Sequence, residues 1–308
     1  MNVPPITTLL PTETLNLENG LSLRPRVRFA LTVYPSDSTA ATKPIDEWKL
    51  KRALLHFLQS TLSISLSFPE DDLSITRLKD SKNRKRDDAV ADGTLYVRDL
   101  KFLENRDFEP KALQTKLNQW KSSIVDKMNF IELNLEGIKY TLSVKIPDCD
   151  DFEKTRKAWE ELNRGRIDTI ILRKVPSRWF SEPRVSSRPS MLVTHSVFSV
   201  FGRIRNLEVV EDDGEKEGLV SGLHCKVAVQ FESYRDFCNA YMVLCSRSLQ
   251  KSGSRLNADY EVTWAKDVYF RNSRSGGERS FNRLAIKEPS QTDNFLAAKE
   301  SRRKRFRE

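Results

Sequence analysis

The fold is decided by the stretch from Asp168 to Phe231, which opens with Thr169-Ile170-Ile171-Leu172-Arg173-Lys174-Val175-Pro176. This β-branched run stops at a proline, so it predicts a strand followed by a turn. The next segment is Phe198-Ser199-Val200-Phe201-Gly202-Arg203-Ile204-Arg205-Asn206-Leu207, which predicts an amphipathic helix that ends at a glycine. Because Gly202 tolerates the positive φ of a helix C-cap, a second strand is expected to follow it at residues 203–210.

A third segment completes the pattern with His224-Cys225-Lys226-Val227-Ala228-Val229-Gln230-Phe231, which predicts another strand. A helical spacing of large side chains follows (Tyr234, Phe237, Tyr241, Leu244), and residues 260–264 predict a last strand. Strand, helix, strand, strand, helix and strand in this order is the ferredoxin-like arrangement. That order, with the Phe-x-x-Phe-Gly-x-Ile corner at residues 198–204, resembles the RNA recognition motif over residues 166–266.

The first half of the chain repeats the same order without repeating the sequence. A strand at residues 26–34 precedes a helix that starts at residues 44–47, and strand-like runs follow at 62–68, 73–78 and 94–103. A second helix at residues 107–125 and a hairpin around Glu136-Gly137 close the unit. A helix at residues 151–163 carries Trp159, and we expect it to pack between the two units and fix their relative orientation.

We therefore predict an α+β fold class with two ferredoxin-like (RNA-recognition-motif-like, βαββαβ) domains. The expected division is a flexible arm at residues 1–20, a first domain at 21–148, a linker helix at 149–165, a degenerate RNA recognition motif at 166–267 and a basic, largely disordered tail at 268–308.

Composition excludes several classes of function. The chain has 308 residues, a net charge of +9 and no apolar run of about 18 residues, so no membrane partner is expected. The first 23 residues contain no Lys or Arg, which argues against a targeting peptide. The four cysteines form no Cys-x-x-Cys pair, so free thiols are expected and a zinc site is not. Nucleotide-binding, hydrolase and metalloprotease motifs do not occur in the sequence, so no enzyme activity, cofactor or small-molecule substrate is expected.

The positive charge lies mainly at the C-terminal end. Residues 266–308 hold twelve Lys and Arg against six Asp and Glu. This excess predicts an anionic partner or a nuclear address. We assign nuclear localisation to the cluster Arg302, Arg303, Lys304 and Arg305, with a merely solubilising tail as the alternative. Basic residues also gather at 79–88, where a solvated loop is expected and a phosphate contact is the alternative.

RNA recognition motifs stack bases on aromatic rings of the two central strands. Those ring positions fall here on Ile171, Lys226 and Ala228, and none is aromatic. At about 1–3 kcal/mol per base, three missing rings weaken single-strand binding by roughly 3–9 kcal/mol. Side-chain alternation places further polar groups on the same face, so the RNA-binding candidates are Ile171, Arg173, Lys226, Ala228 and Gln230. A solvated or partner-covered sheet is the alternative.

A degenerate RNA recognition motif can instead bind protein. Trp179 and Phe180, in the loop after the first strand of the motif, are candidate partner-binding residues because exposed tryptophan often anchors an interface. The alternative is that Trp179 packs against the first helix of the motif.

Several longer sequence segments resemble those of one protein family. The segments are Gly20-Leu21-Ser22-Leu23-Arg24-Pro25, Arg166-Ile167-Asp168-Thr169-Ile170-Ile171-Leu172, Val175-Pro176-Ser177-Arg178-Trp179-Phe180, residues 198–206 and Phe231-Glu232-Ser233-Tyr234. With these segments, residues 20–265 resemble the N-terminal part of the splicing-associated A-kinase anchor protein 17A family. The resemblance implies a nuclear RNA-binding, RNA-processing protein that associates with speckles and regulates alternative pre-mRNA splicing, with pre-mRNA and splicing-factor proteins as partners. The alternative is a protein-interaction scaffold of the splicing machinery whose sheet does not bind RNA. Protein kinase A anchoring is not expected, because the family's anchoring helices lie in an extension beyond this sequence.

Overall fold

The computed structural model describes residues 9–36, 45–61, 69–78, 88–103, 110–161, 167–182, 185, 188–211, 223–266 and 269–270. Three predicted features lie outside these residues: the strand at 62–68, most of the basic loop at 79–88, and the tail cluster Arg302, Arg303, Lys304 and Arg305. In the part of the chain that is described, none of the helices has the length and apolar character needed to span a bilayer.

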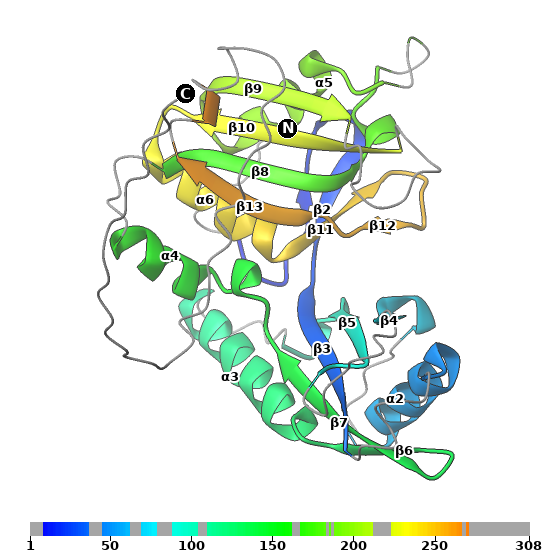
Figure 1. Ribbon diagram of the computed structural model, residues 1–308. Helices are drawn as coiled ribbons and strands as arrows, with labels where there is room; N and C mark the ends of the chain where they lie inside the picture. The colour runs from blue at the N-terminus through cyan, green and yellow to red at the C-terminus, as the bar shows by residue number, and fades with distance from the viewer. Residues whose placement is uncertain are drawn as a thin grey trace, which may run out of the picture.

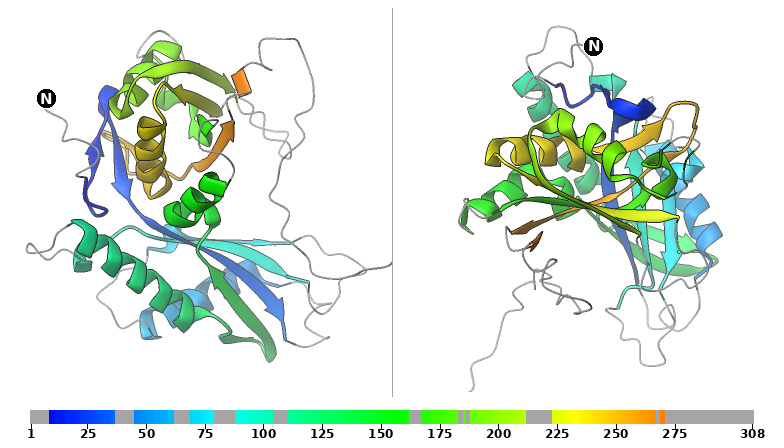
Figure 2. Two further views of the ribbon diagram at one scale, coloured as in Figure 1. Left: turned by 90° about the vertical axis from the view of Figure 1, so that its left-hand side faces the viewer. Right: turned by 90° about the horizontal axis from the view of Figure 1, so that it is seen from above.

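The second unit has the predicted ferredoxin-like sheet, with two helices on one face (Figures 1 and 2). Its strands, in spatial order, are β13 (Glu261–Lys266), β8 (Ile167–Pro176), β10 (His224–Phe231) and β9 (Ile204–Glu211), and its helices are α5 (Met191–Phe198) and α6 (Tyr234–Cys245). All neighbouring strands pair antiparallel. Ile170 and Leu172 of β8 and Val227 and Val229 of β10 are buried in the core on the helical side. The opposite, or outer, face is therefore formed by the alternate residues of each strand.

The first helix of this unit lies earlier in the chain than the sequence predicts. The prediction placed it from residue 198, whereas α5 ends at Phe198 and a single 3₁₀ turn, Ser199–Phe201, follows. Gly202 then takes φ 149°, where a Cβ atom would lie 2.4 Å from the Asp236 carboxyl. The residues after the glycine pair with β10 as a strand. This strand, Ile204–Glu211, confirms the one expected at residues 203–210, so only the placement of the helix before the glycine is wrong.

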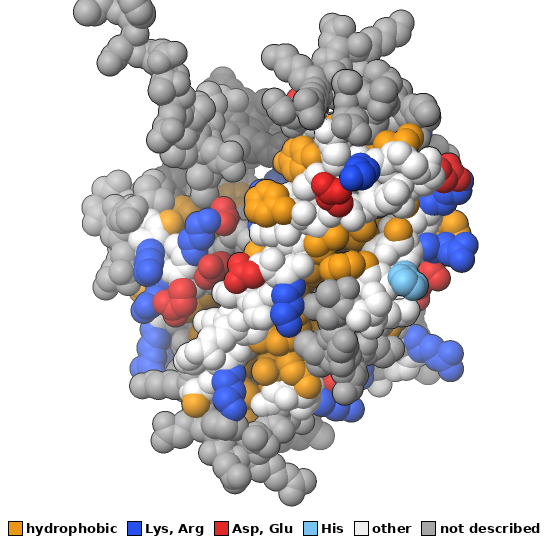
Figure 3. Space-filling view, turned by 90° about the horizontal axis from the view of Figure 1, so that it is seen from below, with side chains coloured by type: hydrophobic (Ala, Val, Ile, Leu, Met, Phe, Trp, Pro, Cys, Tyr) orange, Lys and Arg blue, Asp and Glu red, His pale blue; other side chains and the backbone are white. Residues whose placement is uncertain are grey.

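The first unit also follows the ferredoxin-like order, with one strand added at an edge. Its sheet consists of β4 (Leu73–Arg77), β5 (Ala91–Val97), β3 (Val27–Pro35), β7 (Ile138–Lys145) and β6 (Glu132–Leu135). The helices α2 (Glu47–Thr61) and α3 (Pro110–Met128) cover one face with buried leucines such as Leu54 and Leu117. On the underside of the unit, hydrophobic side chains run along the middle and charges of both signs are scattered around them (Figure 3).

Residues 9–25 pack against the second unit, although the sequence predicts a flexible arm up to residue 20. Strands β1 (Leu15–Asn16) and β2 (Leu21–Pro25) form a small sheet with β11 (Arg247–Lys251) and β12 (Asn257–Ala258). Leu15, Leu21 and Leu23 are buried in the core of the second unit. The predicted domain boundary at residue 21 coincides with the start of β2, but the leucines on both sides of it, Leu15 and Leu21, belong to the core of the second unit. Only Arg26 separates β2 from β3, so the chain runs almost directly from one unit into the other.

The linker contains a 3₁₀ turn, Asp148–Asp150, and helix α4 (Phe152–Glu161). Trp159 of α4 is fully buried in the core of the second unit, 4.9 Å from Phe237 and from Tyr241 between ring centroids. The turn faces the first unit, because Arg28 of β3 donates to Asp150 at 2.7 Å. The linker therefore contacts both units.

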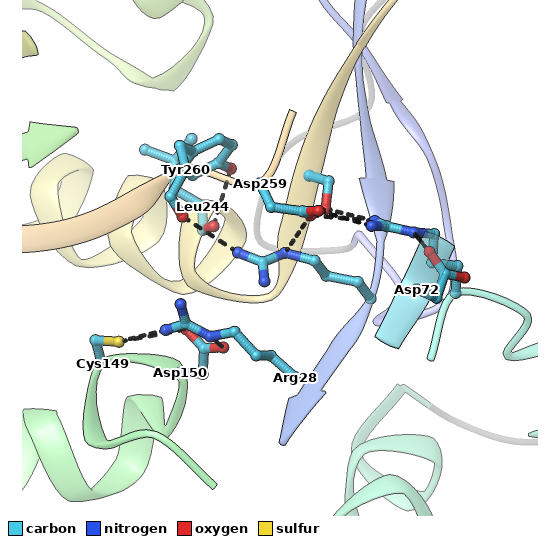
Figure 4. A network of polar contacts seen from close by, with 10 residues as sticks. Arg28, Asp72, Cys149, Asp150, Leu244, Asp259 and Tyr260 are labelled. Atoms are coloured by element: carbon cyan, nitrogen blue, oxygen red, sulfur yellow. Dashed lines mark hydrogen bonds and ion pairs between the residues drawn. The ribbon is translucent and has the colours of Figure 1, made fainter. Parts of the chain in front are cut away.

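A polar network fastens the two units at their junction (Figure 4). The Arg98 guanidinium of the first unit donates to Asp72 at 2.7 Å and to Asp259 of the second unit at 2.7 Å. Asp259 also accepts from Ser248. Arg26, whose side chain is only 1% exposed, lies 3.8 Å from the same carboxylate and 5.1 Å from the centroid of the Tyr96 ring. The Asp259 carboxylate thus contacts two arginines, Arg98 of the first unit and Arg26 of the segment that joins the units.

Candidate nucleic-acid interface

The outer face of the second sheet is built by the register of its four strands. Ala228 of β10 lies between Ile171 of β8 and Glu208 of β9, and Thr263 of β13 lies on the other side of Ile171. Residues directly opposite in an antiparallel sheet point to the same side, so these four side chains form one row across the outer face. The register therefore brings two of the predicted ring positions, Ile171 and Ala228, next to each other.

The centre of this row is small and apolar. Ile171 is 8% exposed and Ala228 is 1% exposed, although both lie on the side opposite the helices. Aliphatic side chains there offer contact area without the flat face on which a base stacks. That either residue touches RNA stays a prediction.

Gln230 is occupied by its neighbours on the sheet. Its Nε2 donates to Asp168 Oδ2 at 2.8 Å, and its Oε1 accepts from Asn206 Nδ2 at 2.5 Å. The Asp168 carboxylate also accepts from the Thr169 hydroxyl at 2.9 Å. Gln230 thus lies on the outer face, as alternation predicts, but it is only 1% exposed there because its amide is held by neighbouring side chains.

The opposite end of the face carries cations. A β-bulge in the pairing of β8 with β10 falls between Cys225 and Val227, and Lys174 takes φ 61° at this point. The bulge interrupts the alternation, so Arg173 and Lys174 are both exposed. Lys174 pairs with Glu261 at 2.7 Å. Lys226 is half-buried beside them.

One aromatic residue that the sequence prediction missed, Tyr269, contacts this face, and a second, Phe270, packs against it. Tyr269, three residues after the end of β13, donates its hydroxyl to Glu208 at 2.9 Å. The Nζ atom of Lys226 lies 5.1 Å from the centroid of the Tyr269 ring. Phe270 packs edge-on against Tyr269 at 5.1 Å between ring centroids. Burial and the neighbouring Glu208 raise the pKa of Tyr269, so the phenol is protonated at neutral pH.

A signal for these residues does exist in the sequence. Tyr269 and Phe270 form an aromatic pair three residues after the last strand, at the start of an otherwise polar and basic tail. Such a pair is compatible with a return of the chain onto the sheet. The prediction placed the whole segment from residue 268 in a disordered tail and therefore passed over it.

The predicted partner-binding pair divides between core and surface. Phe180 is fully buried and stacks on Phe198 at 6.1 Å between ring centroids, so its proposed role as an exposed anchor is corrected to a core role. Trp179 is half-buried against the same core, and its carbonyl oxygen accepts from Asn19 and Lys251. Trp179 is therefore part of the margin of the core, and its expected packing against the first helix of the motif stays a prediction. The described residues contain no group of three or more His, Cys, Asp or Glu placed to hold a metal ion.

Comparison with known proteins bears directly on this surface. A family model described as "AKAP-17A-like, RNA-binding domain" matches residues 112–308, which include the whole second sheet. A-kinase anchor protein 17A from Homo sapiens is 30% identical over 118 residues, and the aligned region covers 34% of this chain and 17% of that relative. The matched family is a family of binding domains and not of enzymes. Since its model covers well over half of the chain, this protein belongs to the AKAP-17A-like RNA-binding domain family.

Proposed function

We propose that this protein binds pre-mRNA in the nucleus and regulates its splicing. The observation that carries the proposal is the outer face of a ferredoxin-like sheet, with Arg173 and Lys226 near one end, in a member of an RNA-binding domain family. The two helices occupy the opposite face of this sheet, as they do in RNA recognition motifs. The role in splicing, the nuclear location and the splicing-factor partners rest on the resemblance to the A-kinase anchor protein 17A family.

Two parts of the chain supply positive charge for RNA phosphates. Arg173, Lys174 and Lys226 lie on or beside the outer face. The tail adds the cluster at residues 302–305. The two parts are expected to differ in how their RNA affinity depends on salt, since a tail contact is purely electrostatic whereas a sheet contact also involves the bases.

Binding to a single-stranded RNA, followed by fluorescence anisotropy at several salt concentrations, separates the two parts. Deleting residues 299–308 is expected to flatten the plot of log K against log salt concentration, because each lost phosphate contact lowers the slope by about 0.7. The double change Arg173→Ala and Lys226→Ala is expected to weaken the binding that remains after this deletion by about tenfold or more.

A matched control is Lys154→Ala with Arg156→Ala, which removes two exposed cations from α4. This control should leave the residual binding unchanged. If the deletion of residues 299–308 abolishes all binding, or if the control acts like the sheet variant, RNA does not contact the outer face.

A splicing reporter tests the cellular role. Expressing the full chain is expected to change the ratio of alternatively spliced products. The variant with Arg173→Ala, Lys226→Ala and residues 299–308 deleted is expected to have no such effect at equal protein level. An unchanged product ratio with the wild-type chain would contradict the splicing role.

A protein-interaction scaffold is the second candidate, and the absence of aromatic residues at Ile171, Lys226 and Ala228 favours it. Capture of partners from nuclear extract treated with RNase distinguishes it from RNA binding. A scaffold should retain splicing-factor partners after RNase, whereas partners bridged by RNA should be lost.

A further inference from the structure

The only aromatic side chains that the described residues place on the outer face come from beyond the last strand. The outward positions of the strands hold Ile171, Ala228, Thr263 and Glu208 in the central row, and Trp264 of β13 packs on the core side against Trp159. Tyr269 contacts Glu208 of β9 and Lys226 of β10 across this row. The Tyr269 side chain therefore lies over β10, one of the two central strands on which an RNA recognition motif displays its stacking rings, and over the neighbouring edge strand β9.

Two roles are compatible with a ring at this place. In the first role the ring covers a surface of the sheet that could bind RNA, and so blocks it. In the second role RNA binds to the ring itself. A blocking role requires a surface beneath that binds RNA once it is exposed. The strands beside Tyr269 offer the carboxylate of Glu208 and, next to it in the register, the small apolar Ala228. Removing the ring would leave no flat surface for a base and would uncover a negative charge that repels phosphate.

We propose that Tyr269 and Phe270 form the base-stacking platform of this domain for single-stranded RNA, in place of the rings that its strands lack. This inference rests on the proposed RNA binding by the outer face, and it names the residues that meet the bases. Both side chains are partly exposed. Their rings lie at 77° to each other, so the pair offers faces in two directions to bases that are not stacked on one another.

Neighbouring polar groups hold the platform in place. The Tyr269 hydroxyl donates a hydrogen bond to the Glu208 carboxylate, and this bond holds the ring against β9. The bond also occupies part of the hydrogen-bonding capacity of that carboxylate. Lys226 contacts the ring through its ammonium group and stays near the outer surface, where it can also neutralise a phosphate. Arg173 lies at the same end of the face. Stacking and phosphate contacts are thus provided within one small area.

The test measures RNA affinity of full-length variants with a fluorescent single-stranded oligonucleotide of mixed sequence. Tyr269→Ala and Phe270→Ala are each expected to weaken binding by roughly 5- to 150-fold, the range for loss of one stacked base. The dependence on salt should not change, because neither substitution removes a positive charge. Tyr269→Phe keeps the ring and loses only the hydroxyl, so it should retain most of the affinity.

Phe130→Ala serves as the matched control, since this ring is 79% exposed and lies in the first unit. It should bind RNA like the wild-type chain. Thermal unfolding followed by circular dichroism should give equal midpoints for all variants, because Tyr269 and Phe270 follow the last strand. Ultraviolet crosslinking of the wild-type chain to RNA, with peptide mapping, should identify the peptide that contains Tyr269 and Phe270.

The outcomes separate this inference from the function on which it rests. Stronger binding by Tyr269→Ala would show that the segment blocks the face, and unchanged binding by both alanine variants would show that no base stacks there. If Arg173→Ala with Lys226→Ala weakens binding while the aromatic variants do not, the sheet binds RNA and only the platform is refuted. A wild-type chain that binds no RNA would refute both.

Discussion

Replacing Trp159 by alanine is expected to lower the free energy of unfolding by about 3–5 kcal/mol, the range for deleting a large buried aromatic side chain. Trp159 is fully buried, and its ring contacts Phe237 and Tyr241 of α6 and Trp264 of β13. The substitution would open a cavity where the linker helix meets the second unit. Urea denaturation followed by circular dichroism measures the change.

Two variants make this result specific. The Trp159 Nε1 atom is buried without a hydrogen-bond partner, so Trp159→Phe loses ring area but no satisfied polar contact and should cost less than alanine. Lys157→Ala changes an exposed residue of the same helix and should stay within about 0.5 kcal/mol of wild type. A loss of less than 1 kcal/mol for Trp159→Ala would mean that α4 does not depend on its burial.

The second large effect is expected from Asp259→Ala at the junction of the two units. This change leaves the Arg98 guanidinium with one carboxylate fewer and removes the carboxylate nearest to the buried Arg26. Removing one partner of a buried pair costs about 3–5 kcal/mol, and we expect the lower end because Arg98 and Asp259 are each 20% exposed. Because the lost contacts join the units, urea unfolding should also change from one transition to two.

Partner substitutions test the cause. Removing Arg98 together with Asp259, as Arg98→Met with Asp259→Ala, should cost less than the sum of the two single changes, because the double variant leaves fewer unpaired charges. Additive costs would mean that the two residues do not interact in solution. Small-angle scattering of the single variant should show a larger radius of gyration if the units separate.

The sequence predicts the second sheet well because each strand carries its own local signal. The apolar run of β10 was predicted with its observed bounds, His224–Phe231, and β8 differs from its prediction only at its start. The prediction of α5 failed for a local reason, since the apolar spacing of residues 198–201 fits a helix, whereas these residues are the end of α5 and a single 3₁₀ turn. The pairing of β2 with β11 has no local signal, because the two strands are separated by more than 200 residues of sequence.

The candidate site was predicted in part. Alternation placed Ile171 and Ala228 on one face, and the register confirms that they are neighbours. It did not show that Gln230 would be held by Asp168 and Asn206, since hydrogen-bond geometry depends on side chains from three strands. Nor did it place Tyr269 on the sheet, because a return of the chain after β13 cannot be read from periodicity. The residues now proposed to meet RNA bases came from the structure.

Because β2 pairs with β11, the second unit can complete its fold only late in protein synthesis. Ser22 and Gln250 are 228 residues apart in sequence, yet a hydrogen bond joins them in the finished fold. At a translation rate of about 5–20 residues per second, β11 is synthesised on the order of ten seconds or more after β2. Until then the leucines of β2 remain exposed to water. We expect nascent chains at this stage to bind chaperones that cover exposed hydrophobic segments.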